Sequence, residues 1–262
     1  MFIVNHGKKI CYWSKGKLGT TTLRIMVPDE LHNHGPWEIV DQNILKASDD
    51  VTKINWDLYK DYEIFCPIRS PKNRYYSGLL EDIFTFYRTL TDNKPSYELI
   101  DLSIEKDWYN TIDYLYSITL YDMSLGLSYH VSNWLNEIVY LYFKNLNVKV
   151  FDMSEWNIHY REKYNLEQPQ LINENPTKIK QFVKDYFENN VNPYVSGLLN
   201  NYLKSEEEIY NILRQSTIDY KLVLNKTQIE TIKDLLQEES NSFVPSSSQI
   251  VTDRLDQILD LI

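Results

Sequence analysis

Cysteine, long apolar runs and an excess of positive charge are what this sequence lacks. Only two cysteines, Cys11 and Cys66, occur in 262 residues, each inside an apolar run. This argues against a disulfide framework and predicts two buried thiols. No stretch reaches the roughly 18 consecutive apolar residues of a membrane-spanning helix, and residues 1–9 have no apolar signal-peptide core. We therefore expect an intracellular, cytoplasmic protein with no membrane span.

Acidic residues outnumber basic ones, 37 to 27, so the formal net charge is −10. General nucleic-acid binders use clustered Lys and Arg to displace counterions from phosphates, so we expect no nucleic-acid partner. The same charge argues against a highly sulfated or uronate-rich polymer as a ligand, because long-range repulsion would oppose its approach. Any site that binds an anion must therefore depend on a local group of residues and not on the overall charge.

The composition is that of a folded globular protein, with 43% apolar and 24% charged residues. Strands are predicted at 10–13, 62–68 and 148–151, and helices at 74–90, 108–120, 133–143, 177–188, 205–213, 226–238 and 251–261. This alternation predicts an α/β fold, a parallel sheet flanked by helices. We expect one domain over 1–214 and a C-terminal helical extension over 215–262. The extension would pack on the domain or on a partner chain, which allows a homo-oligomer.

The segment after the first predicted strand has the chemistry of a phosphate-binding loop. It contains two lysines, two glycines, three threonine hydroxyls and one leucine. The residues are Lys15, Gly16, Lys17, Leu18, Gly19, Thr20, Thr21 and Thr22. Glycines let the backbone approach an anion, and a helix start offers N–H groups to it. Seen alone, the segment also fits a solvated loop with a Thr helix cap. A P-loop NTPase would need Gly-Lys-Ser/Thr, but Gly19 precedes Thr20.

Two segments together carry a family resemblance. Lys17 to Leu23 is similar to the Lys-x-Gly-Thr/Ser-Thr-x-Leu element of the carbohydrate, Golgi-type sulfotransferases. Arg69 to Ser77, after the second predicted strand, resembles that family's Arg-Asp/Asn-Pro-x-x-Arg-x-x-Ser element. Tyr202 to Tyr210 resembles its terminal helix, in which Tyr and an acidic pair precede Ile/Leu-Tyr. The resemblance covers roughly residues 8–213.

The resemblance implies a P-loop-like fold of the sulfotransferase type. The cofactor would be 3′-phosphoadenosine 5′-phosphosulfate, with its 5′-phosphosulfate held by residues 15–22. Arg69 and Ser77 would contact the 3′-phosphate, which suits a guanidinium that grips phosphate in a bidentate way. The acceptor would be a hydroxyl group of a glycan or a small molecule.

A candidate general base lies between the two loops. Sulfuryl transfer benefits from a base that takes the acceptor's proton and, by analogy with phosphoryl transfer, from a cation at the departing oxygen. His34 or His32 suits the first task and Lys17 the second. The His-x-His arrangement is similar to the histidine segment of the uronyl, heparan-type members. The histidines also fit a purely structural loop, and we expect no metal site.

Two other functions stay open. A nucleotide-dependent kinase or NTPase on a related fold would need a metal-binding acid after a strand and a Gly-Lys-Ser/Thr loop. A non-catalytic nucleotide-binding protein would keep the fold and the nucleotide without transfer. The favoured prediction is a sulfotransferase that depends on 3′-phosphoadenosine 5′-phosphosulfate (PAPS) and works by in-line displacement with a His base.

Overall fold

The computed structural model describes residues 2–14, 18, 37–41, 51–78, 134–155, 193–242 and 256–261, together with residues 185 and 189. The strands are β1 Phe2–Asn5, β2 Ile10–Trp13, β3 Trp37–Asp41, β4 Glu63–Ile68, β5 Asn147–Asp152, β6 Thr217–Ile218 and β7 Lys221–Leu222. The α-helices are α5 Leu135–Phe143, α8 Pro193–Gln215 and α9 Lys226–Ser242, and residues 71–78 are also helical. Short 3₁₀ turns are η1 Val51–Lys53, η2 Trp56–Tyr59 and η5 Met153–Glu155.

The strands form one mixed sheet in the order β3-β1-β2-β4-β5-β7-β6. β4 lies between β2 and β5 and is parallel to both. β1 is antiparallel to β2 and β3, and β7 is antiparallel to β5 and β6. The α/β class is confirmed, but the prediction of a parallel sheet is correct only for β2, β4 and β5.

Short connections explain the antiparallel strands. Residues 6–9 join β1 to β2, and residues 219–220 join β6 to β7. A parallel neighbour needs a crossover of a dozen or more residues, so these turns permit only hairpins. Asp219 and Tyr220 both have positive φ, 49° and 66°. Two such residues make the type I′ turn that matches the twist of a hairpin.

Two of the parallel strands, β2 and β4, are buried on both faces. Ile64 and Cys66 of β4 point into the main core, which also contains Trp13 and side chains of α5, α8 and α9. On the other face Tyr12 stacks on Phe65, with ring centroids 5.4 Å apart. Burial on both faces explains why these strands read as continuous apolar runs rather than as alternating ones.

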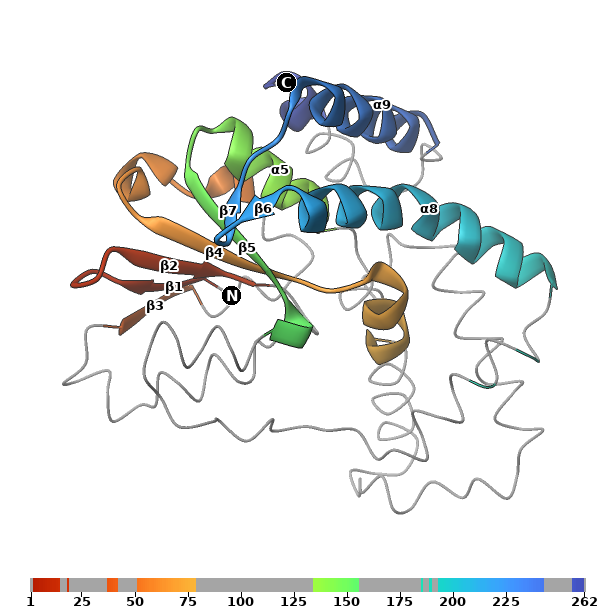
Figure 1. Ribbon diagram of the computed structural model, residues 1–262, viewed down its shortest axis with the longest axis horizontal. Coiled ribbons are helices and arrows are strands. Elements are labelled where there is room, and N and C mark those ends of the chain that lie inside the picture. Colours follow the sequence, from red (N-terminus) through yellow and green to blue (C-terminus); the bar gives the residue numbers. More distant parts are fainter. Residues whose placement is uncertain are drawn as a thin grey trace, which may run out of the picture.

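The helices α5, α8 and α9 pack on one side of the sheet (Figure 1). α5 and α8 contact β5, and α9 packs on α8. Ile232 and Leu236 of α9 and Ile258 belong to the same core as the strands. The residues that follow 215 thus continue the sheet, through β7, and the core.

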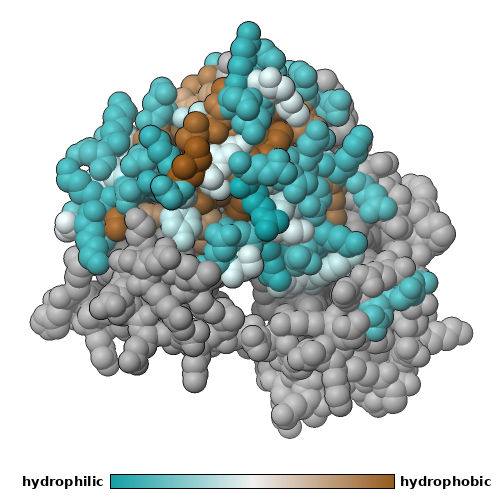
Figure 2. All heavy atoms as spheres, in the orientation of Figure 1, coloured by the Kyte–Doolittle hydropathy of each residue, from teal (hydrophilic) through white to brown (hydrophobic). Residues whose placement is uncertain are grey.

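The surface of the described part is mostly polar. Figure 2 shows hydrophilic side chains over most of the face in view, with apolar ones in small groups between them. The large apolar side chains with most exposure are Leu58, Ile218, Val223 and Leu261. Ile218 and Val223 lie at the β6–β7 hairpin, and Leu58 and Leu261 come from distant segments of the sequence. In the described part of the chain, no helix is long and apolar enough to cross a membrane.

Candidate functional site

The carboxyl ends of β2, β4 and β5 lie at one edge of the sheet, because the three strands are parallel. Tyr12 of β2 pairs with Phe65 of β4, and Ile68 at the end of β4 pairs with Asp152 of β5. The segments that leave these strands therefore start side by side. Ligands of open α/β sheets bind at this edge. Figure 1 shows the helix at 71–78 leaving β4 there.

Several buried polar side chains lie near this edge, whereas Asn5 pairs with Ile10 at the other end of β2. Among the described residues, the buried polar side chains are Asn5, Ser14, Arg74, Asn136, Glu137, Glu206 and Ser216. Ser14 follows β2, Arg74 lies in the helix that follows β4, and Asn136 and Glu137 lie in the first turn of α5. Glu206 of α8 accepts a hydrogen bond from the backbone N–H of Trp134, which directly precedes α5 (3.2 Å). Burying polar groups is costly unless they are paired, so such a cluster is a candidate functional site.

The loop after β2 is closed by a side chain. Ser14 is fully buried, and its Oγ donates a hydrogen bond to the carbonyl oxygen of Leu18 (2.8 Å). The Leu18 side chain belongs to the core, so this residue could meet a nucleotide only through its backbone. The other predicted residues of this loop, Lys15, Gly16, Lys17, Gly19, Thr20, Thr21 and Thr22, lie outside the described residues.

The second predicted loop places two guanidinium groups near each other. Arg69 directly follows β4 and is half-buried, and Arg74 is only 2% exposed. Burial lowers the pKa of Arg69, and the positive charge of Arg74 lowers this pKa further, while the negative charge of Asp152 opposes both effects. The charges of Arg74 and Asp152 thus act on the pKa of Arg69 in opposite directions. Ser77, predicted beside Arg69, is half-buried in the second turn of the helix.

One turn of α8 holds the segments around this edge. The Oε1 atom of Glu207 accepts hydrogen bonds from Ser70 Oγ (3.0 Å) and from the backbone N–H of Lys72 (2.9 Å). The Tyr210 hydroxyl donates a hydrogen bond to Asp152 Oδ2 at the end of β5. The sequence indicated this turn only as part of the Tyr202 to Tyr210 resemblance. Its partners could not be read from the sequence, because they lie 58 to 137 residues away.

Asp152 is held in its ionised form. Burial would raise the pKa of this carboxyl, but hydrogen bonds from Tyr210 and Ser154 outweigh burial and hold the pKa below its ordinary value. Burial and the bond to Asp152 raise the pKa of Tyr210. The edge therefore brings two arginines together with the carboxylates of Asp152 and Glu207. Both carboxylates accept hydrogen bonds from neighbouring groups.

The histidines predicted as the general base cannot be placed, and the prediction of no metal site can be compared only with the described residues. His32 and His34 are both outside them. No group of His, Cys, Asp and Glu side chains that could hold a metal ion occurs among the residues that are described.

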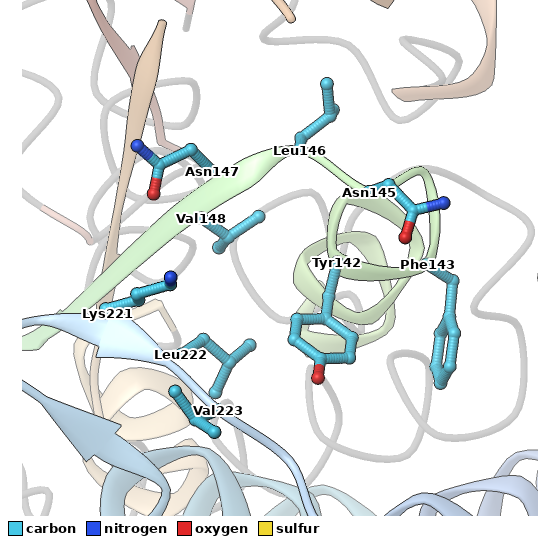
Figure 3. A pocket seen from close by; sticks show the side chains of 9 residues that line it. All are labelled: Tyr142, Phe143, Asn145, Leu146, Asn147, Val148, Lys221, Leu222 and Val223. Atoms are coloured by element: carbon cyan, nitrogen blue, oxygen red, sulfur yellow. The ribbon is translucent and has the colours of Figure 1, made fainter. Parts of the chain in front are cut away.

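A pocket of about 500 Å³ lies at the opposite edge of the sheet. Figure 3 shows its lining: the last turn of α5 with Tyr142 and Phe143, the start of β5, and β7 with Lys221. β5 begins at Asn147, so the pocket lies at the amino end of the parallel strands. It is therefore separate from the edge at which β2 and β4 end.

Comparison with known proteins adds no family to this picture: no protein-family model, curated protein or solved structure matches the chain.

Proposed function

We propose that the protein is a sulfotransferase that transfers a sulfuryl group from 3′-phosphoadenosine 5′-phosphosulfate to a hydroxyl group of a glycan or small molecule. The observation that carries the proposal is the parallel pairing of β2 with β4. This pairing starts both motif segments, the loop after Ser14 and the loop at Arg69, at the same edge. A nucleotide with phosphates at both ends of its ribose needs two such anion sites close together.

The described residues fit the 3′-phosphate. A guanidinium can bind phosphate through two parallel hydrogen bonds, and Arg69 lies at the strand end next to the charge of Arg74. A phosphate group would relieve the repulsion between the two cations. Ser77 supplies a hydroxyl in the same helix.

The cofactor would supply the activated sulfuryl group, and the chain would supply binding and proton transfer. In the proposed reaction a bond forms between the acceptor oxygen and sulfur, and the bond between sulfur and the phosphate oxygen breaks. His34 or His32 accepts the proton of the acceptor hydroxyl. Lys17 donates a hydrogen bond to the departing phosphate oxygen, and adenosine 3′,5′-bisphosphate leaves.

A thermal-shift titration with adenosine 3′,5′-bisphosphate tests the proposal. A ligand that binds only the folded state stabilises it by about 2.7 kcal/mol at a hundredfold excess over its Kd. We expect a shift in the wild type, and a much smaller shift in Lys17→Ala and Arg69→Ala. Lys233→Ala is the matched control, because Lys233 is an exposed lysine of α9. It should behave as the wild type.

The same titration separates the proposal from a kinase or NTPase. ATP with magnesium should give a smaller shift than adenosine 3′,5′-bisphosphate without metal. A preference for magnesium-ATP, or no shift of the wild type with the bisphosphate, contradicts the proposal. Sulfuryl transfer to a panel of glycans and small alcohols, lost in a His32→Ala/His34→Ala variant, distinguishes an enzyme from a non-catalytic nucleotide-binding protein.

A further inference from the structure

Glu207 caps a helix that belongs to a distant part of the chain. The first N–H groups of a helix have no partner within the helix, and in the helix at 71–78 one of them, at Lys72, donates to Glu207 Oε1. The Ser70 hydroxyl donates to the same oxygen instead of capping its own helix. A carboxylate at a helix start is favourable, because the helix dipole is positive there.

The turn that carries Glu207 is itself firmly held. Leu203, Ile209 and Leu213 of α8 are buried. Glu206 accepts a hydrogen bond from the backbone N–H of Trp134, and Tyr210 donates one to Asp152. The Glu207 carboxylate therefore projects from a fixed frame. It acts on Ser70, the residue next to Arg69.

We infer that Glu207 is a positioning residue for recognition of the nucleotide 3′-phosphate, an inference that rests on the proposed function. By holding Ser70 and the first turn of the helix, Glu207 fixes the backbone from which the Arg69 side chain extends. It also occupies the Lys72 amide, so this N–H group of the helix start is not available to the phosphate. Phosphate recognition at this edge then depends on the guanidinium being held in one place.

The test is the preference for a 3′-phosphate, measured by calorimetry as the ratio of the Kd of adenosine 5′-monophosphate to that of adenosine 3′,5′-bisphosphate. Glu207→Ala should lower this ratio about tenfold, the equivalent of one lost charge-assisted hydrogen bond. Glu207→Gln keeps an acceptor oxygen and should retain the wild-type ratio within about threefold. Glu208→Ala is the matched control, because Glu208 is the exposed neighbour of Glu207 on α8.

The ratio separates positioning from simple stabilisation. If Glu207 only stabilises the fold, its loss weakens both nucleotides alike and leaves the ratio unchanged, which overturns the inference. A loss in Glu207→Gln as large as in Glu207→Ala also overturns it. If Glu207→Ala does not fold, Ser70→Ala takes its place. A ratio lowered by about threefold then supports the inference, and an unchanged ratio overturns it.

The proposed function and the role of Glu207 can be contradicted independently of each other. A wild type that binds neither nucleotide, or that shows no preference for the 3′-phosphate, contradicts the proposed function before any variant is made. A wild type with the preference, together with an unchanged ratio in a folded variant, contradicts only the role of Glu207.

Discussion

The indole Nε1 of Trp13 donates a hydrogen bond to Glu137 Oε2 across 124 residues of sequence, at 2.9 Å. Trp13 is the last residue of β2 and is fully buried, and Glu137 is only 1% exposed. A buried carboxylate needs donors, since burial removes its hydration. This contact joins the start of the proposed phosphosulfate loop to the first turn of α5.

Trp13→Phe should destabilise the protein by about 3 kcal/mol, because Glu137 loses a donor and the core loses volume. Urea unfolding measures the change in the free energy of unfolding. A double-mutant cycle with Glu137→Ala, which removes the acceptor, isolates the hydrogen bond, and the coupling should be about 1.5 kcal/mol or more, as for bonds to charged groups. A coupling near zero would show that Trp13 acts by packing alone.

Tyr210→Phe should destabilise the protein by about 1–2 kcal/mol near neutral pH. The Tyr210 hydrogen bond helps to hold the pKa of Asp152 below its ordinary value in the folded state. The unfolded chain therefore binds more protons than the folded protein around that value. The stability that the bond contributes is complete above the ordinary pKa, and it is lost as the pH falls through the folded pKa.

The cost of Tyr210→Phe should accordingly shrink as the pH falls below about 5, as measured by urea unfolding at each pH. Tyr142→Phe is the matched control. The Tyr142 hydroxyl accepts a hydrogen bond from the backbone N–H of Leu224, a neutral partner (3.3 Å). A cost of Tyr210→Phe that does not change with pH would contradict the role of Asp152.

Leu236→Ala should destabilise the protein by about 2–5 kcal/mol, the usual cost of truncating a fully buried leucine. Leu236 of α9 has no exposed surface and belongs to the same core as β2 and β4. Lys233→Ala, on the exposed face of α9, should change stability by less than about 0.5 kcal/mol. A small cost for Leu236→Ala would mean that α9 contributes little to this core.

Both thiols should be unreactive in the folded protein. Burial raises the pKa of Cys11, and burial followed by the charge of Glu137 raises the pKa of Cys66. Because the thiolate is the reactive form, dithionitrobenzoate should titrate no thiol at about pH 8. In denaturant it should titrate both of the two cysteines. Fast reaction of either thiol in the native state would contradict the buried positions of these strands.

Local signals predicted the central elements well. The apolar runs gave β2 at its observed bounds and β4 and β5 to within a residue at each end. The predicted start of a helix at Lys226 is confirmed, and the capping pair explains it: the backbone N–H of Gln228 donates to Asn225 Oδ1, and that of Asn225 donates to Gln228 Oε1. Pro67 lies within β4, but beyond the last pair of this strand with β2.

The antiparallel strands β1, β3, β6 and β7 were not predicted, and shortness accounts only for β6 and β7. β1 is only Phe2–Asn5, and β6 and β7 have two residues each. The turn between β6 and β7 uses Asp219 and Tyr220 at positive φ, without the glycine that usually marks such a turn. The Phe-Ile-Val run before His6 and Gly7 was a readable hairpin signal.

The sequence by itself determined the central strand runs, the start of α9 and the choice of residues suited to anions, because these follow from nearest neighbours along the chain; it placed the start of α8 twelve residues too late. Only the tertiary structure decided that β2 and β4 are adjacent and parallel, so that the segments after Trp13 and Ile68 begin at one edge. It also decided that Glu207 reaches Ser70 across 137 residues. Such pairings depend on how helices and strands pack around a shared core, and local propensity carries no information about them.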